Sequence, residues 1–460
     1  MLNQPHGPQE RPNVSQRFYR AAEKLNVPVL LWSVWVGILA GLMGGIFELS
    51  INTLLHQREL LAQSLTPYPW LYWTIPSGLA AVMVAGSFWL MRKFAPETSG
   101  GGIPQIEGYI DGLLPLNWKR VLPIKFLGGI LSLGGGMVNG FEGPTIQIGG
   151  SIGQMIGNWF KANPEQVRML VASGAGAGLT TAFNAPLAGI IFVFEEMHPG
   201  FADWPLAYRS TMIASAIATI VERALRGQGA VVSLTKFSRV PLESLWIFVL
   251  LGVFFGVLGY LFNHYLLRAL DWFSNRRGAT SRFIGVWVGL IMGFLALVPL
   301  PITGTGENAI IWAFNSEAPS YLLILVFIAR LGLTIFCYGS GVIGGVFQPM
   351  LAIATVASLG FAREIHAFFP QQLPEPSVMA IAGMGALVAA TVRAPLTAIL
   401  LTIEMTDNYF VILPLLITCL TATMIAHLLG GEPIYSVLLK RTCEKRSQLL
   451  STSPPPDQPH

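Results

Sequence analysis

Long stretches without charged residues alternate with short polar segments along most of this chain. Residues Asn26 to Phe47 carry no charge and are flanked by Lys24 and Glu48, so this stretch is long enough to cross a bilayer as a helix. Comparable stretches follow at 70–91, 205–221, 244–263, 283–302, 321–361 and 376–431. The pattern predicts an all-α membrane protein that crosses the bilayer many times.

Two further apolar stretches look interrupted. Residues 121–138 contain Lys125, and residues 169–194 contain many glycines, so neither is expected to cross the bilayer alone as one helix. The runs 321–361 and 376–431 are long enough for more than one helix each. The chain has 49 glycines in 460 residues, which suits close helix contacts and broken helices.

Composition supports the membrane class and excludes others. Hydrophobic residues make up 53% of the chain and charged residues 11%, against about 25% charged in a soluble domain. The basic residues flank the apolar runs, so the net charge of +4 does not indicate a nucleic-acid partner. The three cysteines have no CxxC spacing, which indicates neither a zinc site nor a disulfide framework.

The charges at the two ends of the chain predict its orientation. By the positive-inside rule, both termini are expected in the cytoplasm, with an even number of crossings. The N-terminus is too long and polar for an ordinary signal peptide. Residues 1–14 and 450–460 are expected to be disordered, and residues 11–24 to form a surface helix. The basic residues that carry the argument are Arg11, Arg17, Arg20 and Lys24 before the first run, and Lys440, Arg441, Lys445 and Arg446 after the last.

The two halves of the chain resemble each other. Asn184-Ala-Pro-Leu-Ala-Gly-Ile190 parallels Arg393-Ala-Pro-Leu-Thr-Ala-Ile399, and Gly140-Phe-Glu-Gly-Pro144 parallels Gly345-Val-Phe-Gln-Pro349, at nearly one spacing. A duplicated unit explains this better than chance, and paired interrupted segments indicate a transporter binding site. We predict a cytoplasmic segment at 1–29, transmembrane repeats at 30–225 and 243–440 joined by a linker at 226–242, and a cytoplasmic tail at 441–460.

Glu142 is the main functional candidate. It lies within an apolar run, between glycines and two residues before Pro144, which suits the first turn of a helix. At a helix N-terminus the unpaired N–H groups and the dipole favour an anion. Such a site either binds an external anion or is occupied by its own glutamate. The alternative is a structural glutamate that caps the helix that follows.

Two other glycine-rich turns offer backbone N–H groups to an anion. Gly100-Gly-Gly-Ile-Pro104 contains Gly101, Gly102 and Ile103, and it is equally well explained as loop geometry. Gly344-Gly-Val-Phe-Gln-Pro349 contains Val346 and Phe347 and is the repeat partner of the Glu142 segment. Phe347 stands where Glu142 stands, so one half offers a titratable side chain and the other bare N–H groups.

Two adjacent glutamates end the apolar stretch before residue 197. Glu404 occupies the position of Glu195 in the second repeat, so Glu195 is predicted to be structural and Glu196 is the unmatched acid. Tyr435 offers a hydroxyl donor, although a tyrosine at the membrane interface is the commoner explanation. Glu107 and Lys125 are predicted to form a structural pair.

Together these motifs resemble the CLC family of chloride channels and proton/chloride antiporters. Gly100–Pro104 is similar to the GSGIP element of the family, Gly140–Pro144 to GREGP and Gly344–Pro349 to GxFxP. The similarity covers about residues 30–440, and the three elements in this order are specific. Matches around Glu196 and Glu404 point to bacterial members.

The resemblance implies the CLC fold of two inverted-topology repeats of tilted, partly broken helices. It also implies a homodimer with one pore per subunit in the bacterial inner membrane, with chloride and protons as transported ions and no cofactor. Chloride would be held by Val346, Phe347 and Tyr435, with Gly101, Gly102 and Ile103 opposite. Glu142 would be the gating and proton-accepting glutamate. Glu196 would be the inner proton-transfer glutamate, which favours exchange over a channel.

Two positions depart from the family pattern. The serine of GSGIP is Gly101, which leaves Tyr435 as the only side-chain hydroxyl for the anion. The missing hydrogen bond is worth about 0.5–1.5 kcal/mol. The sequence therefore predicts that the site binds an anion, but it does not predict a preference for chloride over nitrate. The arginine of GREGP is Phe141, which removes a cation beside Glu142 and is expected to change the turnover or its pH dependence.

Other functions explain the sequence less well. A passive anion channel gated by Glu142 is the runner-up, and a fluoride exporter fits Pro144 and Tyr435 poorly. An intramembrane enzyme could use Glu142 and Glu196 as a carboxylate pair. The sequence, however, contains no HExxH, GxSxG or Gly-Asp aspartyl-protease motif. A receptor or structural protein would leave the repeat and the glycine turns unexplained.

Overall fold

A computed structural model describes residues 26–197, 201, 203–227, 229, 240–276, 278, 282–315, 317–368 and 375–452. The predicted N-terminal surface helix, the predicted tails at 1–14 and 453–460 and most of the predicted linker lie outside the described residues. Residues 450–452, predicted to be disordered, are helical. The regular secondary structure of the described part is helical, apart from two isolated β-bridges, which confirms the predicted all-α class.

The first half of the chain contains eight α-helices up to residue 226, within the described residues. Most begin with a proline in the first turn, where its missing N–H is not needed. The elements are α2 (Val27–Ser64), α3 (Pro69–Phe94), the short 3-10 helix η1 (Pro96–Thr98), α4 (Ile103–Ile110), α5 (Trp118–Gly134), α6 (Glu142–Trp159), α7 (Pro164–Phe183), α8 (Pro186–Glu195) and α9 (Trp204–Arg226).

The second half repeats the use of short and broken helices. It contains η2 (Leu242–Ser244), α10 (Leu245–Ser274), α12 (Ile284–Leu295), α13 (Glu307–Asn315), α14 (Ser320–Gly339), α15 (Phe347–Phe368), α16 (Pro376–Val392), α17 (Pro395–Thr406), η3 (Tyr409–Val411), α18 (Ile412–Leu428) and α19 (Ile434–Thr452).

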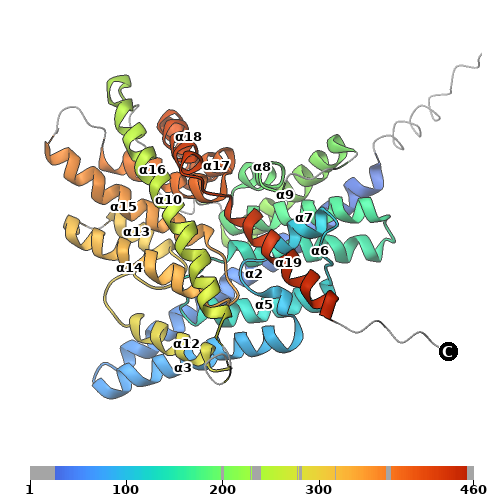
Figure 1. The fold of residues 1–460 in the computed structure, drawn as a ribbon, viewed down its shortest axis with the longest axis horizontal. Helices are drawn as coiled ribbons and strands as arrows, with labels where there is room; N and C mark the ends of the chain where they lie inside the picture. The colour runs from blue at the N-terminus through green and yellow to red at the C-terminus, as the bar shows by residue number, and fades with distance from the viewer. Residues whose placement is uncertain are drawn as a thin grey trace, which may run out of the picture.

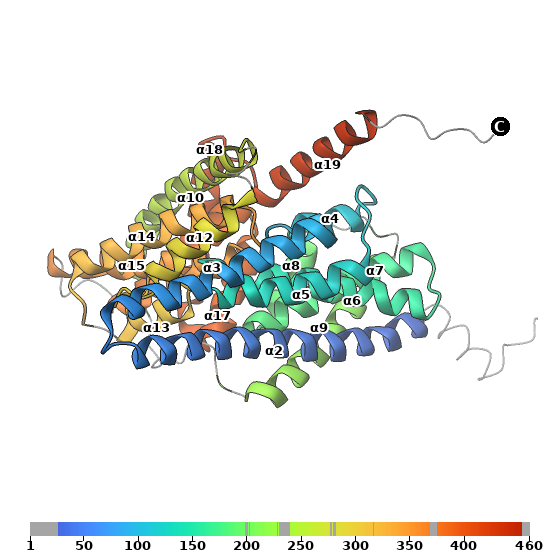
Figure 2. The same cartoon turned by 90° about the horizontal axis from the view of Figure 1, so that it is seen from below.

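The two halves lie side by side. Helices α5 to α9 occupy one side of the view in Figure 1 and α13 to α16 the other, while α8 packs against α17 between them. Helix α2 runs along one edge of the molecule and α19 projects from the opposite edge (Figure 2). Five helices within the described ranges are long and apolar enough to span a membrane: α2, α3, η2 with α10, α14, and η3 with α18.

The corresponding breaks in the two halves have the same local cause. Asn184 ends α7 and Arg393 ends α16, both in the left-handed conformation (φ 50° and 71°). Each is followed by Ala-Pro, and the proline starts the next helix, because a residue before proline disfavours the helical conformation. The run 169–194 is therefore interrupted as predicted. In contrast, 121–138 is largely one helix, α5, which contains Pro123.

Glycine allows α6 and α7 to lie in close contact. A Cβ atom on Gly149, Gly174 or Gly178 would run into the backbone of the facing helix. This packing holds the N-terminus of α6, and with it Glu142, in a fixed place between the two halves.

Candidate functional site

The three glycine-rich turns meet at the centre of the molecule. Gly140 and Gly345 form an antiparallel bridge, with N–H···O distances of 2.8 and 2.7 Å in the two directions. The Gly344 N–H donates to the Gly100 carbonyl at 3.1 Å. Segments far apart in the sequence therefore place the N-terminal ends of α4, α6 and α15 around one point.

Glu142 occupies this point with its side chain. It is the first residue of α6 and is fully buried. Its Oε1 accepts a hydrogen bond from the Phe347 N–H at 2.7 Å, and its Oε2 has no hydrogen-bond partner within the described part of the chain. The carboxylate thus lies at the N-terminus of α15, in the other half, rather than capping its own helix.

The space for this carboxylate depends on two glycines. A Cβ atom on Gly140 or on Gly345 would collide with the Glu142 carboxylate. Any larger residue at either position would have to displace the side chain, which is flexible enough to move.

Gly140→Ala is therefore expected to push the Glu142 carboxylate away from the Phe347 N–H. We expect anion flux at neutral pH to rise severalfold toward its value at acidic pH, because the site is no longer blocked. Chloride efflux from liposomes at the two pH values measures this. Gly78→Ala is the control, since a Cβ there has no atom within 4 Å; an unchanged pH dependence in Gly140→Ala would contradict the prediction.

The remaining predicted anion-site residues surround the same point. Val346 and Phe347 lead into α15 and are fully buried, and Ile103 starts α4. Gly102 has φ 95°, and a Cβ there would meet the Gln147 side chain, so glycine is required. Gly101 lines a large cavity that reaches the site.

Tyr435 lies inside the protein rather than at the membrane interface. It is 1% exposed, and its hydroxyl has no hydrogen-bond partner among the residues that the structure describes. The side chain is close enough to Glu142, Glu196 and Tyr338 to interact with them electrostatically. The interface interpretation is therefore wrong, and the hydroxyl is available to a ligand.

Glu195 and Glu404 form a matched pair of helix caps. The Glu195 carboxylate accepts from the N–H groups of Leu396 and Thr397 at the start of α17 (2.9 and 2.6 Å). The Glu404 carboxylate accepts from Leu187 and Ala188 at the start of α8 (3.0 and 2.8 Å). This reciprocal arrangement fits the structural reading of Glu195.

Glu196 follows at the C-terminal cap of α8 and has different surroundings. It is 5% exposed and interacts electrostatically with Glu107 and Glu195. It is not among the residues that line the large cavity.

The predicted pair between Glu107 and Lys125 is wrong. Lys125 is fully buried, and its Nζ donates to the carbonyls of Thr98 (2.9 Å) and Gly100 (2.7 Å). Glu107 instead lines a smaller cavity against α19. Lys125 therefore fixes the backbone of the first glycine turn.

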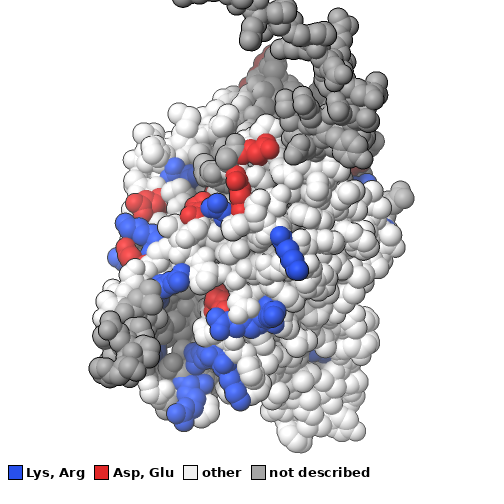
Figure 3. Space-filling model, turned by 90° about the vertical axis from the view of Figure 1, so that its right-hand side faces the viewer, with Lys and Arg blue, Asp and Glu red and all other residues white. Residues whose placement is uncertain are grey.

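A cavity of about 1200 Å³ leads to the site from the surface. Its lining includes six cationic and three anionic side chains, and Lys and Arg gather around a hollow on the face seen in Figure 3. Two of the cations are paired, Arg120 with Glu97 (2.7 Å) and Arg441 with Asp271 (2.8 Å). The net positive lining favours anions over cations.

Sequence reasoning missed Tyr338. It lies at the end of α14, is 4% exposed and lines the cavity together with Gly100 and Gly101. It falls within the long apolar run 321–361 and outside every motif, so the sequence carried no signal that could have found it.

Comparison with known proteins identifies the family of the chain. The family described as voltage gated chloride channel matches residues 80–427. The chain is 43% identical over 428 residues to the H(+)/Cl(-) exchange transporter ClcA of Klebsiella pneumoniae (strain 342), covering 92% of this chain and 91% of that one. It is 44% identical over 452 residues to ClcA of Vibrio cholerae serotype O1 (strain ATCC 39541), covering 96% and 95%.

Solved structures give the same result. A slow cyanobacterial Cl⁻/H⁺ antiporter matches with a TM-score of 0.90 and 59% identity, covering 91% of this chain and 99% of that one. A eukaryotic CLC transporter matches with a TM-score of 0.74 and 21% identity, covering 90% and 74%, which shows the shared fold. The predicted CLC fold is confirmed, and this multi-pass membrane protein belongs to the CLC family of voltage-gated chloride channels and transporters.

Proposed function

We propose that this protein exchanges chloride for protons across the membrane. The observation that carries the proposal is the hydrogen bond from the Phe347 N–H to the Glu142 carboxylate. A carboxylate and a halide are both anions, and both are stabilised by N–H groups at a helix N-terminus. The names of the similar proteins, H(+)/Cl(-) exchange transporter and Cl⁻/H⁺ antiporter, support the same activity.

Because the Glu142 carboxylate and chloride compete for the same N–H groups, chloride binding is linked to the protonation of Glu142. While Glu142 is ionised, it occupies the N–H groups that chloride needs. When Glu142 accepts a proton it loses its charge, leaves the site and admits the anion. Each replacement of the carboxylate by chloride therefore goes with the uptake of one proton at the same residue.

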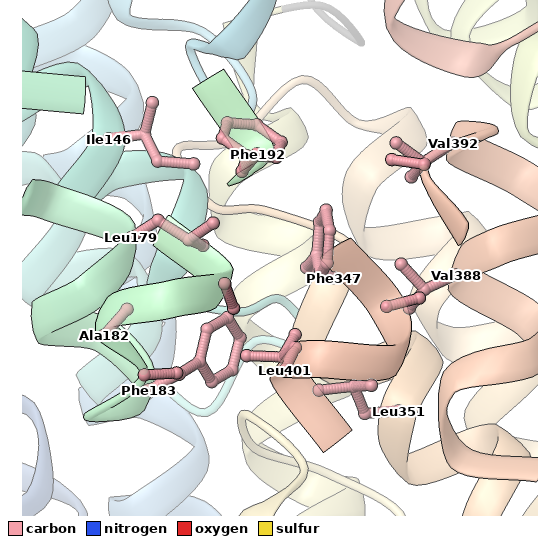
Figure 4. Close-up of a cluster of buried hydrophobic side chains, with 14 of the residues drawn as sticks. Ile146, Leu179, Ala182, Phe183, Phe192, Phe347, Leu351, Val388, Val392 and Leu401 are labelled. Carbon is pink, nitrogen blue, oxygen red and sulfur yellow. The ribbon is translucent and has the colours of Figure 1, made fainter. Parts of the chain in front are cut away.

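The protons need a route of their own on the inner side. Figure 4 shows an apolar cluster at the meeting of the two halves, with Phe183 and Phe192 facing Phe347. The ring centroids lie 6.3 Å (Phe183–Phe347) and 6.1 Å (Phe192–Phe347) apart. Chloride is excluded from such surroundings. We infer that Glu196 passes protons toward Glu142 past this cluster, while chloride uses the basic cavity.

In the proposed site, chloride is held by the N–H groups of Val346 and Phe347 and by the Tyr435 hydroxyl. Gly101, Gly102 and Ile103 contribute the facing turn at the start of α4. The site uses backbone donors because a full positive charge would hold the anion too tightly to release it. Lys125 lies behind this turn, where its Nζ donates to the Gly100 carbonyl.

Reconstitution into liposomes tests the exchange. A chloride gradient is expected to drive protons uphill, with the pH change abolished when the protein is omitted. A gradient that moves chloride but no protons would favour the alternative, a passive anion channel gated by Glu142.

We also propose a homodimer with one pore per subunit in the bacterial inner membrane, with both termini cytoplasmic. Helices α8, α9, α17 and α18 expose large apolar side chains on neighbouring surfaces, which suits subunit packing in a membrane. These side chains are Leu187, Ile220, Leu396, Leu420, Met424 and Leu428. Cysteine pairs introduced at Leu420 and Met424 are expected to give cross-linked dimers in membranes, and only monomers would contradict this.

A further inference from the structure

The first glycine turn lacks a side-chain donor, but a hydroxyl lies beside it. Position 101 is glycine, so α4 contributes only backbone groups to the site. The Tyr338 hydroxyl lies 3.4 Å from the point where a Cβ of Gly100 would stand, and Tyr338 and Gly101 line the same cavity. This hydroxyl belongs to the other half of the chain.

The Tyr338 hydroxyl has a proton to donate. Among the described residues, no side-chain hydrogen bond engages this hydroxyl, so its proton is available to a ligand. The side chain is 4% exposed and lines the cavity at its inner end. The Gly100 carbonyl accepts from the Gly344 N–H (3.1 Å), two residues before Val346, so the hydroxyl lies beside the turns that frame the anion site.

We propose that Tyr338 is a second side-chain donor to the bound anion, in the role that a serine at position 101 would otherwise fill. This inference rests on the proposed function. With Tyr435, two phenolic hydroxyls then face the anion, one from α14 and one from α19. A neutral hydroxyl binds a halide through one directed hydrogen bond. Tyr338 therefore contributes to the affinity for chloride and to the preference for chloride over larger anions.

Position 101 has room for a serine, whose hydroxyl would replace that of Tyr338 as a donor. A Cβ on Gly101 would have its nearest neighbours at 3.7 Å (Gly143 Cα and Gly345 Cα), which is ordinary van der Waals contact. Gly101 does not have a positive φ, unlike Gly100 and Gly102. A serine therefore fits at position 101 without strain and would bring its hydroxyl to the same turn.

The test measures chloride binding to purified protein by calorimetry in a Glu142→Gln background, where no carboxylate competes for the site. Tyr338→Phe removes one neutral hydrogen bond and is expected to weaken chloride binding between about two- and twelvefold. Tyr72→Phe is the matched control, because the Tyr72 hydroxyl donates to the Leu297 carbonyl (3.2 Å), outside the site; it should leave the dissociation constant unchanged.

A rescue experiment distinguishes a hydrogen-bond donor to the anion from a residue with a structural role. Adding Gly101→Ser to Tyr338→Phe is expected to restore chloride binding and its preference over nitrate, whereas Gly101→Ala adds the same Cβ without a hydroxyl and should restore neither. Equal binding by Tyr338→Phe and the control, or equal rescue by alanine and serine, would overturn the inference. If the protein with Tyr338 intact binds no chloride, the proposed function itself fails.

Discussion

Replacing Glu142 with Gln is expected to abolish proton movement while chloride flux continues. Glutamine is neutral and close in shape, so it keeps the packing of a fully buried side chain. It carries no charge to compete with the halide for the Phe347 N–H and no site for an exchangeable proton. Chloride-driven proton uptake should fall to the liposome background, and chloride efflux should lose its dependence on pH.

Glu404→Gln controls for the loss of a buried glutamate elsewhere. Its carboxylate caps α8 through the Leu187 and Ala188 N–H groups, and an amide oxygen retains part of that cap. We expect this variant to keep coupled exchange. Persistent pH-driven exchange in Glu142→Gln would be incompatible with the mechanism, because no other acid occupies the α15 N-terminus in the described structure.

Glu196→Gln is expected to have the second largest effect. Glu196 is buried and lies off the anion cavity, so its replacement should leave chloride binding intact. Without an acid at the inner end of the proton route, Glu142 can no longer exchange protons with that side. Chloride flux should continue, and protons moved per chloride should fall at least about tenfold in parallel flux assays.

The neighbouring glutamate provides a matched comparison. Glu195→Gln makes the same chemical change one residue earlier, but the Glu195 carboxylate is engaged as the α17 cap. Loss of this cap is expected to lower the free energy of unfolding by about 1 kcal/mol, as for other helix caps. The coupling between proton and chloride movement should be largely kept. If both substitutions uncoupled the ions equally, the two glutamates would not have separate roles.

The sequence predicted which residues form the site better than it predicted which atoms those residues contact. Glu142 opens a helix, as its position before Pro144 indicated. The sequence could not show that its carboxylate reaches the Phe347 N–H, 205 residues away. The sequence indicated bare N–H groups at residues 346 and 347, but it carried no signal for which side chain contacts them. The same reason explains the wrong partner for Lys125, which donates to two carbonyls.

Helix ends were predicted well where proline or glycine sets them and poorly elsewhere. The uncharged run that predicted the first span ends at Phe47, but α2 continues to Ser64. Glu48 lies within this helix, buried in an ion pair with Arg226 (2.7 Å). The run 283–302 contains only the short helix α12. Pro299 and Pro301 lack the N–H that would continue it.

The backbone bridge between Gly140 and Gly345 has a consequence for how the protein acquires its activity. Each strand of the bridge, and each helix start beside it, comes from a different half of the chain. A separated half would present a glutamate without the backbone N–H group that donates to it, or that N–H group without its glutamate. Ion recognition therefore emerges only after both halves have folded and docked, late in the assembly of each polypeptide.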